Sequence, residues 1–165
     1  MKKLLTLILL MLSALPQALA QASFPNKPVK LVVAFPPGGS TDITARLLAT
    51  KLAERWGQPV VVENKPGAGA NIGTALVAKA PPDGHTLLLA TTALSISPSV
   101  FRQPGYDALR DLAPVTMVST IPNVLVVNKD VPAQSMREFV ALLKTAPGKY
   151  NFAAPGAASG QRMTF

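Results

Sequence analysis

The stretch Phe35-Pro36-Pro37-Gly38-Gly39-Ser40-Thr41-Asp42 decides how the rest of the chain can fold. An apolar run rich in β-branched residues precedes it over residues 29–35, and a helical spacing of apolar residues follows it from Ile43. The sequence therefore predicts a strand, a glycine loop and a helix in succession. The prolines prevent the strand from continuing, and the glycines allow a tight turn that leaves backbone N–H groups uncovered.

This loop has the composition of an anion site at a helix start. Ser40 or Thr41 is expected to cap the helix, and Asp42 falls in its first turn, where negative charge is favoured. Amides and hydroxyls that converge at a helix N-terminus suit an anion. On these residues alone, an ordinary connection between a strand and a helix explains the loop equally well.

Residues 1–20 have the pattern of an export signal. Lys2 and Lys3 form a positive start, an apolar run covers residues 4–12, and Ala18-Leu19-Ala20 is a cleavage motif. We therefore predict a signal peptide over residues 1–20, cleaved after Ala20 or after Ala22 on export to the periplasm. The apolar run is too short to span a bilayer as a stable helix.

The composition argues against several classes of function. The chain has no cysteine and a single histidine, His85, so we expect no disulfide, no thiolate metal site and no cofactor held by such ligands. The net charge is +8, but the basic residues are scattered and only 5% of residues are aromatic. We therefore expect no nucleic-acid partner.

A strand-loop-helix rhythm runs through the first half of the chain. The pattern predicts a strand over residues 29–35, a helix over 43–56, a strand over 59–63, a helix over 71–79 and a strand over 85–90. The strands are short continuous apolar runs and do not alternate with polar residues. Such runs are typical of a parallel sheet that is covered on both faces.

The pattern changes near residue 98. A polar, turn-rich segment over residues 98–111 is a candidate crossover between two lobes. Beyond it we predict strands over residues 115–119, 123–128 and 150–154, and a helix over 135–145 that opens with a capping box at Ser135 and Glu138. A second glycine loop covers residues 155–160, and another helix begins at Gln161.

No motif in the chain predicts catalysis. The glycines of residues 67–73 follow a GxGxxxG spacing and not GxGxxG, so we interpret them as a loop that passes close to its neighbours and not as a dinucleotide site. The chain has no P-loop lysine, no GxSxG elbow, no evident Ser/His/Asp set and no paired carboxylates. What remains is two glycine loops, at residues 35–42 and 154–160, which can face each other across a cleft if they belong to two lobes.

Several short motifs occur together in an order and spacing that one protein family shares. They are Phe24-Pro25, the loop Phe35–Asp42, Val62–Gly69 followed by Asn71-Ile72-Gly73, Pro82-Asp83-Gly84, Tyr106-Asp107, Asp111–Pro114 and Pro147-Gly148-Lys149. On these motifs the chain resembles the periplasmic substrate-binding proteins of tripartite tricarboxylate transporters, also called the Bordetella uptake gene family. The resemblance runs from Phe24 to Phe165.

The resemblance implies an α/β fold of the type II periplasmic-binding-protein kind, with two lobes and mostly parallel sheets. Residues 21–110 would form the first lobe, and residues 111–165 would begin a second lobe that is truncated, because family members are much longer. It also implies a monomer that captures a small carboxylate and delivers it to the membrane permease subunits of the transporter, without enzymatic activity. An exported enzyme acting on a small organic acid, or a fragment that binds no solute, are the alternatives.

The ligand-binding residues that the resemblance implies fall in three segments. They are Phe35, Gly38, Gly39, Ser40, Thr41 and Asp42 in the first loop, Thr91 and Thr92 after the third strand, and Gly156, Ser159 and Gly160 in the second loop. Two positions depart from the family pattern. Ala158 replaces a glycine of the second loop, and Arg162 stands where family members usually have histidine.

Overall fold

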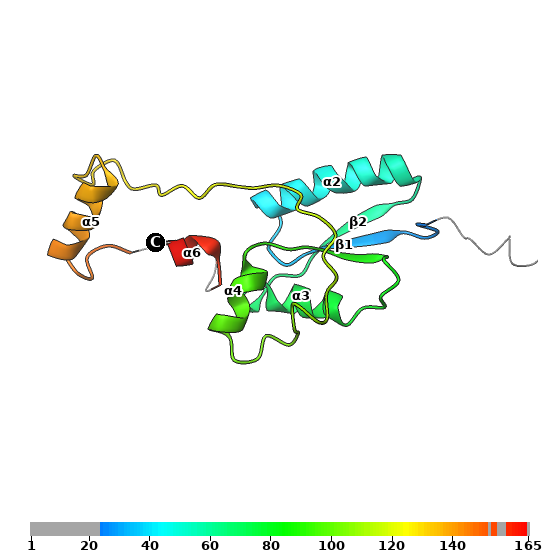
Figure 1. The fold of residues 1–165 in the computed structure, drawn as a ribbon. Helices are drawn as coiled ribbons and strands as arrows, with labels where there is room; N and C mark the ends of the chain where they lie inside the picture. Colours follow the sequence, from blue (N-terminus) through cyan, green and yellow to red (C-terminus); the bar gives the residue numbers. More distant parts are fainter. Residues whose placement is uncertain (1–23, 152, 155–157, 165) are drawn as a thin grey trace, which may run out of the picture.

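The computed structural model describes residues 24–151, 153–154 and 158–164, so the predicted signal peptide and Gly156 lie outside the described residues. In chain order the elements are β1 (Val29–Val33), α2 (Ser40–Trp56), β2 (Val60–Asn64), the 3₁₀ turn η2 (Ala68–Ala70), α3 (Asn71–Ala78), β3 (Thr86–Leu89), α4 (Ala93–Val100), α5 (Met136–Thr145) and α6 (Gly160–Thr164) (Figure 1).

The centre of the fold is a parallel sheet of three strands in the order β2-β1-β3. Val29 of β1 lies opposite Val60 of β2, and Leu31 lies opposite Leu87 of β3. Parallel neighbours need a long crossover, and here helices α2 and α3 lie in the two connections. The predicted α/β fold with a parallel sheet is confirmed.

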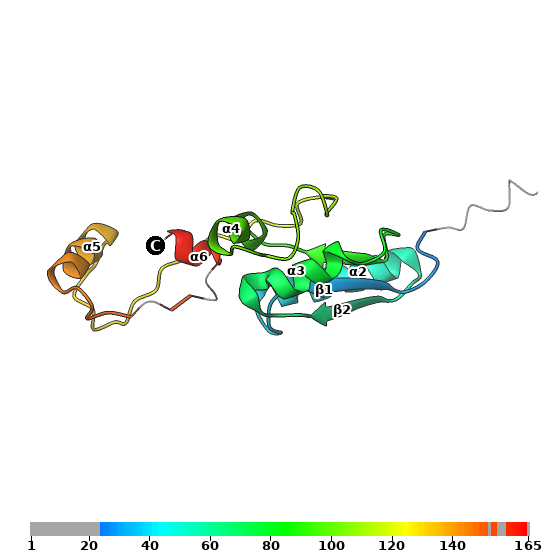
Figure 2. The same cartoon turned by 90° about the horizontal axis from the view of Figure 1, so that it is seen from below.

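Helices cover both faces of this sheet. Helix α2 lies along one face, while α3 and α4 lie on the other side (Figures 1 and 2). The core on the α2 side is built on the buried residues Leu31, Val33, Ala45 and Ala49. A smaller cluster on the opposite face contains Ala34, Ala70 and Ala93. Four of the five residues of β1 are buried, which agrees with a sequence that is apolar apart from Lys30.

Helix α2 starts earlier than the sequence predicts, at Ser40, and the expected cap is wrong. Gly39 occupies the N-cap position with extended backbone, and no side chain caps this end of the helix. The side chain of Asp42 turns back to the loop instead. At the other end Gly57 adopts the expected left-handed conformation, with φ 64°, and its N–H bonds to the carbonyl of Ala53.

Helix α4 was not predicted, because Pro98 indicated a turn-rich segment from that residue on. The structure places Pro98 inside the helix. Ser97 beside it is fully buried, and its hydroxyl donates a hydrogen bond of 2.7 Å to Asn71 on α3. This contact with α3 is made by the turn that contains the proline, so tertiary packing outweighs the local preference against a helix there.

In the second half of the chain, helix α5 is confirmed together with its cap. Ser135 accepts a hydrogen bond from the N–H of Glu138, whose carboxylate accepts one from the N–H of Gln134. The reciprocal bond therefore falls one residue earlier than a regular capping box places it. In Figures 1 and 2, α5 stands away from the sheet.

The strands predicted over residues 115–119 and 123–128 are wrong. Both segments lack regular structure, and the described residues of 150–154 are not in a strand either. A strand needs a neighbour to satisfy its backbone groups, and no described strand lies beside these runs.

The helix expected from Gln161 is present as α6, one residue earlier. None of the described helices is long and apolar enough to cross a membrane. The lobe boundaries at residues 110 and 111 stay a prediction.

Candidate functional site

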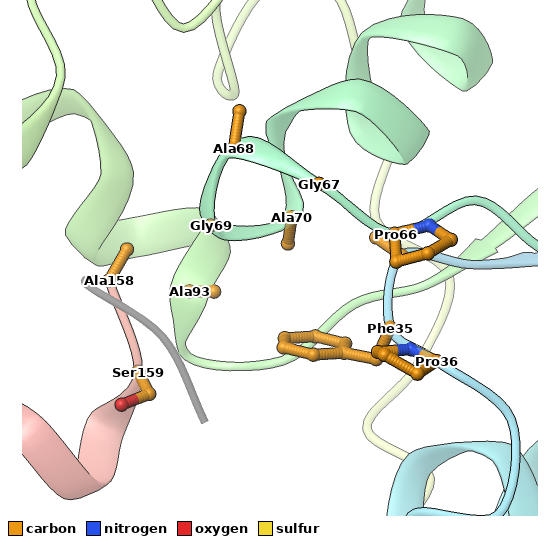
Figure 3. Close-up of a pocket in the computed structure, with 11 residues that line it drawn as sticks. Phe35, Pro36, Pro66, Gly67, Ala68, Gly69, Ala70, Ala93, Ala158 and Ser159 are labelled. Atoms are coloured by element: carbon orange, nitrogen blue, oxygen red, sulfur yellow. The ribbon is translucent and has the colours of Figure 1, made fainter. Parts of the chain in front are cut away.

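The connections that leave the three parallel strands meet at one end of the sheet. They begin at Ala34 after β1, at Lys65 after β2 and at Ala90 after β3. In open α/β sheets this carboxyl end is where ligands bind. A cavity of about 270 Å³ lies here, lined by Ala34, Phe35, Pro36, Pro66, Gly67, Ala68, Gly69, Ala70, Ala93, Ala158 and Ser159 (Figure 3).

The cavity joins segments that are far apart in the sequence. Figure 3 shows Phe35 and Pro36 on one side, and Ala158 and Ser159 across from them. Ala158 is fully buried, and it lies against Gly69, whose added Cβ would be 3.3 Å from the alanine methyl. The second glycine loop therefore reaches the same cavity as the first.

A buried carboxylate holds the first loop. Asp42 is only 3% exposed, and its Oδ2 accepts hydrogen bonds from the N–H of Gly38 at 2.9 Å and from Nε of Arg46 at 3.0 Å. Its Oδ1 accepts one from Nδ2 of Asn64 at 2.9 Å. Asn64 also donates to the carbonyl of Phe35, so the end of β2 is tied to the end of β1. Asp42 thus fixes the path of the loop between Phe35 and the helix.

The same contacts determine the charge of Asp42. The hydrogen bond from Arg46, followed by those from Gly38 and Asn64, lowers the pKa of the Asp42 carboxyl from 3.8 to about 2. Arg46 balances this negative charge at the helix start. The residue at the N-cap of α2 is Gly39, which has no side chain to accept a hydrogen bond. The backbone N–H groups of the first turn, at Ser40 and Thr41, therefore have no capping partner from that residue.

We expect the Asp42 contacts to make stability depend on pH in a defined window. Because the pKa in the folded state is lower than in the unfolded chain, the contribution is complete above pH 4 and is lost as the pH falls toward 2. Urea unfolding of the receptor at its full natural length, as wild type and as Asp42→Asn, measures it from pH 5 to pH 2. The difference in free energy of unfolding between the wild type and Asp42→Asn should shrink as the pH falls from 4 to 2. Arg46→Met should move the loss to higher pH, and a constant difference would contradict the assignment.

The second wall of the cavity, residues 66–70, has an unusual backbone. Gly67 and Gly69 have positive φ, and so do the alanines Ala68 (φ 47°) and Ala70 (φ 80°). Residues other than glycine rarely adopt a positive φ, so the surrounding structure must impose this conformation on the two alanines. Thr74 contributes to this, because its hydroxyl donates a 2.8 Å hydrogen bond to the carbonyl of Ala70.

A buried polar cluster stabilises the start of α3 beside this wall. Oδ1 of Asn71 accepts hydrogen bonds from the hydroxyls of Ser97 at 2.7 Å and of Tyr106 at 3.1 Å. Glycines allow the close packing: a Cβ on Gly69 would lie 2.9 Å from the ring of Phe101. The interpretation of residues 67–73 as a loop that passes close to its neighbours is confirmed.

The third segment brings β3 close to the second loop. The hydroxyl of Thr91 accepts a hydrogen bond from the N–H of Ala93, at the start of α4. A Cβ on Gly160 would lie 2.8 Å from Oγ1 of Thr92, so these two residues are direct neighbours. Ser159, 6% exposed, accepts a hydrogen bond from the N–H of Arg162.

The predicted site residues are thus distributed around the cavity, and two of them line it. These are Phe35 and Ser159. The other described ones are not among the lining residues, namely Gly38, Gly39, Ser40, Thr41, Asp42, Thr91, Thr92 and Gly160. Sequence reasoning missed the wall at residues 66–70, although the glycines after the second strand mark the same sheet end. The described residues contain no cluster of side chains suited to a metal ion.

Comparison with known proteins assigns the chain to a family. Residues 44–165 match the family described as the tripartite tricarboxylate transporter family receptor. The chain belongs to this family. The resemblance in sequence motifs is therefore confirmed, and a family of receptors agrees with the prediction of a binding protein and not an enzyme.

Members of the receptor family with known names or structures are similar over most of the chain. BugT of Bordetella pertussis is 44% identical over 133 residues, which are 79% of this chain and 41% of that protein. The structure described as R. palustris Rpa4515 with adipate is 38% identical with a TM-score of 0.70, and the match covers 75% of this chain and 42% of that one. MatC from Rhodopseudomonas palustris with bound malate is 35% identical with a TM-score of 0.65, over 74% of this chain and 42% of that one. The chain thus spans less than half the length of these relatives.

Proposed function

We propose that this chain provides the first lobe, and the beginning of the second, of a periplasmic receptor that captures a small carboxylate for a tripartite tricarboxylate transporter. The observation that carries the proposal is the cavity at the carboxyl ends of the strands, to which both glycine loops contribute. The binding of adipate and malate by two solved relatives supports a carboxylate as the ligand. Export by the predicted signal peptide and delivery to permease subunits are part of the same proposal.

The carboxylate is proposed to bind at the start of α2. The helix dipole and the first-turn amides favour an anion there, and no capping side chain competes for them. Asp42 is the nearest acidic group in that turn, but its oxygens already accept hydrogen bonds from Gly38, Arg46 and Asn64. We therefore propose Asp42 as the residue that positions the loop, and Ser40 and Thr41 as the residues that meet the solute.

The magnitudes are sufficient for this mechanism. Each hydrogen bond to a charged group contributes about 1.5–3 kcal/mol. A micromolar complex corresponds to about 8 kcal/mol. Several bonds of this kind, from amides of the first loop and hydroxyls such as that of Ser159, reach this value and leave a margin for the entropy lost on binding. Closure of the two lobes around the solute would then exclude water from these bonds.

Replacing Gly39 with valine should weaken the binding of carboxylates without lowering the stability of the fold. Gly39 has an ordinary φ of −79°, and a Cβ there meets only the carbonyl oxygen of Pro36, at 4.0 Å. The side chain therefore fits the fold but occupies the space in front of the α2 amides. We expect the affinity for carboxylates to fall at least about tenfold, the loss of one such hydrogen bond, while the melting temperature of the unliganded protein stays the same.

The measurement is calorimetry with dicarboxylates and with their neutral diamides, on the receptor at its full natural length. The acids should bind and the diamides should not. An NMR time course should show the bound acid chemically unchanged, whereas turnover would point to an enzyme. Binding of the diamides with equal affinity, or unchanged affinity in the Gly39→Val protein, would contradict the proposed site.

A further inference from the structure

The cavity itself is almost entirely apolar on its side-chain surface. Among the described residues that line it, Ser159 is the one with a polar side chain. The others are alanine, glycine, proline and the ring of Phe35. The hydroxyl oxygen of Ser159 already accepts a hydrogen bond from the N–H of Arg162, which leaves its proton as the one side-chain donor of the described lining residues.

The backbone of the cavity wall is partly engaged as well. The carbonyl of Gly67 accepts a hydrogen bond from the N–H of Ala70 at 3.1 Å, within η2. The carboxylate of Asp42 does not line the cavity, because it turns to the loop and to Asn64. Among the described lining side chains, a polar substituent on a bound molecule would therefore find a single partner, the hydroxyl of Ser159.

We infer that the cavity selects for an unsubstituted carbon skeleton, so that the receptor prefers aliphatic carboxylates without hydroxyl groups to their hydroxylated analogues. This inference rests on the proposed function and specifies its substrate class. The carboxylate would bind at the α2 amides, and the methylene groups would lie against Phe35, Ala70 and Ala93. Burial of apolar surface there is favourable, whereas a buried hydroxyl without a partner loses its hydration.

The expected selectivity is moderate, because an apolar pocket cannot strongly reject an added hydroxyl. Discrimination of this kind is roughly 10- to 100-fold. Two pairs of acids test it, since the members of each pair differ by one hydroxyl: succinate against malate, and glutarate against 2-hydroxyglutarate. Competition calorimetry on the receptor at its full natural length should show tighter binding of succinate and glutarate by roughly this factor.

A variant of the wall provides the internal control. Ala93→Ser adds a hydroxyl to the lining and should reduce the ratio between the members of each pair, whereas Ala90→Ser, at an exposed position outside the lining, should leave it unchanged. Equal or tighter binding of the hydroxylated acids by the wild type would overturn the selectivity while leaving the proposed function in place. Binding of none of the four acids, nor of adipate, the acid found with a solved relative, would overturn the proposed function itself.

Discussion

Replacing Gly73 with alanine is expected to lower the free energy of unfolding by about 2 kcal/mol. A Cβ at this position would lie 2.8 Å from the carbonyl oxygen of Lys65 and 2.9 Å from Cβ of Ala34. Both neighbours are held firmly, because Lys65 is bonded to Val33 at the end of the sheet and Ala34 is buried. Overpacking of this kind costs about 3 kcal/mol, and the higher helix propensity of alanine offsets about 1 kcal/mol.

The matched control for this variant is Gly39→Ala. The same methyl group is added there, but the position has ordinary φ and no neighbour closer than 4.0 Å. Its free energy of unfolding should change by less than about 0.5 kcal/mol. Thermal and urea unfolding of the receptor at its full natural length measure both variants, and the Gly73→Ala midpoint should fall by on the order of 10 °C. Equal stability of the two variants would show that α3 can move away from β1 without cost.

The parts of the fold that depend on neighbouring residues in the chain could be predicted from local sequence. The strand β1, the helix α2 with its final Gly57, and the helix α5 with its Ser135 cap depend on neighbouring residues, and all were predicted. The strands expected over residues 115–119 and 123–128 depend on a partner that no local pattern contains. Their apolar, β-branched composition indicates only that they suit a sheet.

The site was predictable to the extent that it follows from topology. A glycine loop after β1 marks the carboxyl end of the sheet, and so places Phe35 at the cavity. The role of Asp42 was not predictable, because a first-turn aspartate can face solvent as easily as the loop. Its orientation depends partly on Asn64, which bonds to its Oδ1 and is 22 residues away in the sequence. The positive φ of Ala68 and Ala70 likewise has no local signal, since alanine rarely adopts it.

Residues 21–165, expressed alone, are expected to bind a hydrophobic dye strongly and to unfold without a sharp transition. The reason is the exposed apolar surface of the second half. Val115 is 84% exposed, Met117 is 81% exposed and Val126 is 83% exposed. Met136 on helix α5 is also 51% exposed. So much exposed apolar surface is uncommon on a soluble monomer and promotes association.

Two companion proteins locate the surface to which the dye binds. A chain of residues 21–112 keeps the sheet with α2, α3 and α4 and lacks the exposed segment, so it should bind less dye per molecule. A fusion of residues 21–165 to the remaining C-terminal part of BugT should bind less dye as well, because the chain spans 41% of that relative and the added part can cover the second half. It should also melt cooperatively, since cooperative unfolding requires a continuous buried core. Weak dye binding and a sharp melting transition for residues 21–165 alone would show that residues 113–151 find partners within this chain, and that their apolar side chains do not need the C-terminal part that the longer relatives have.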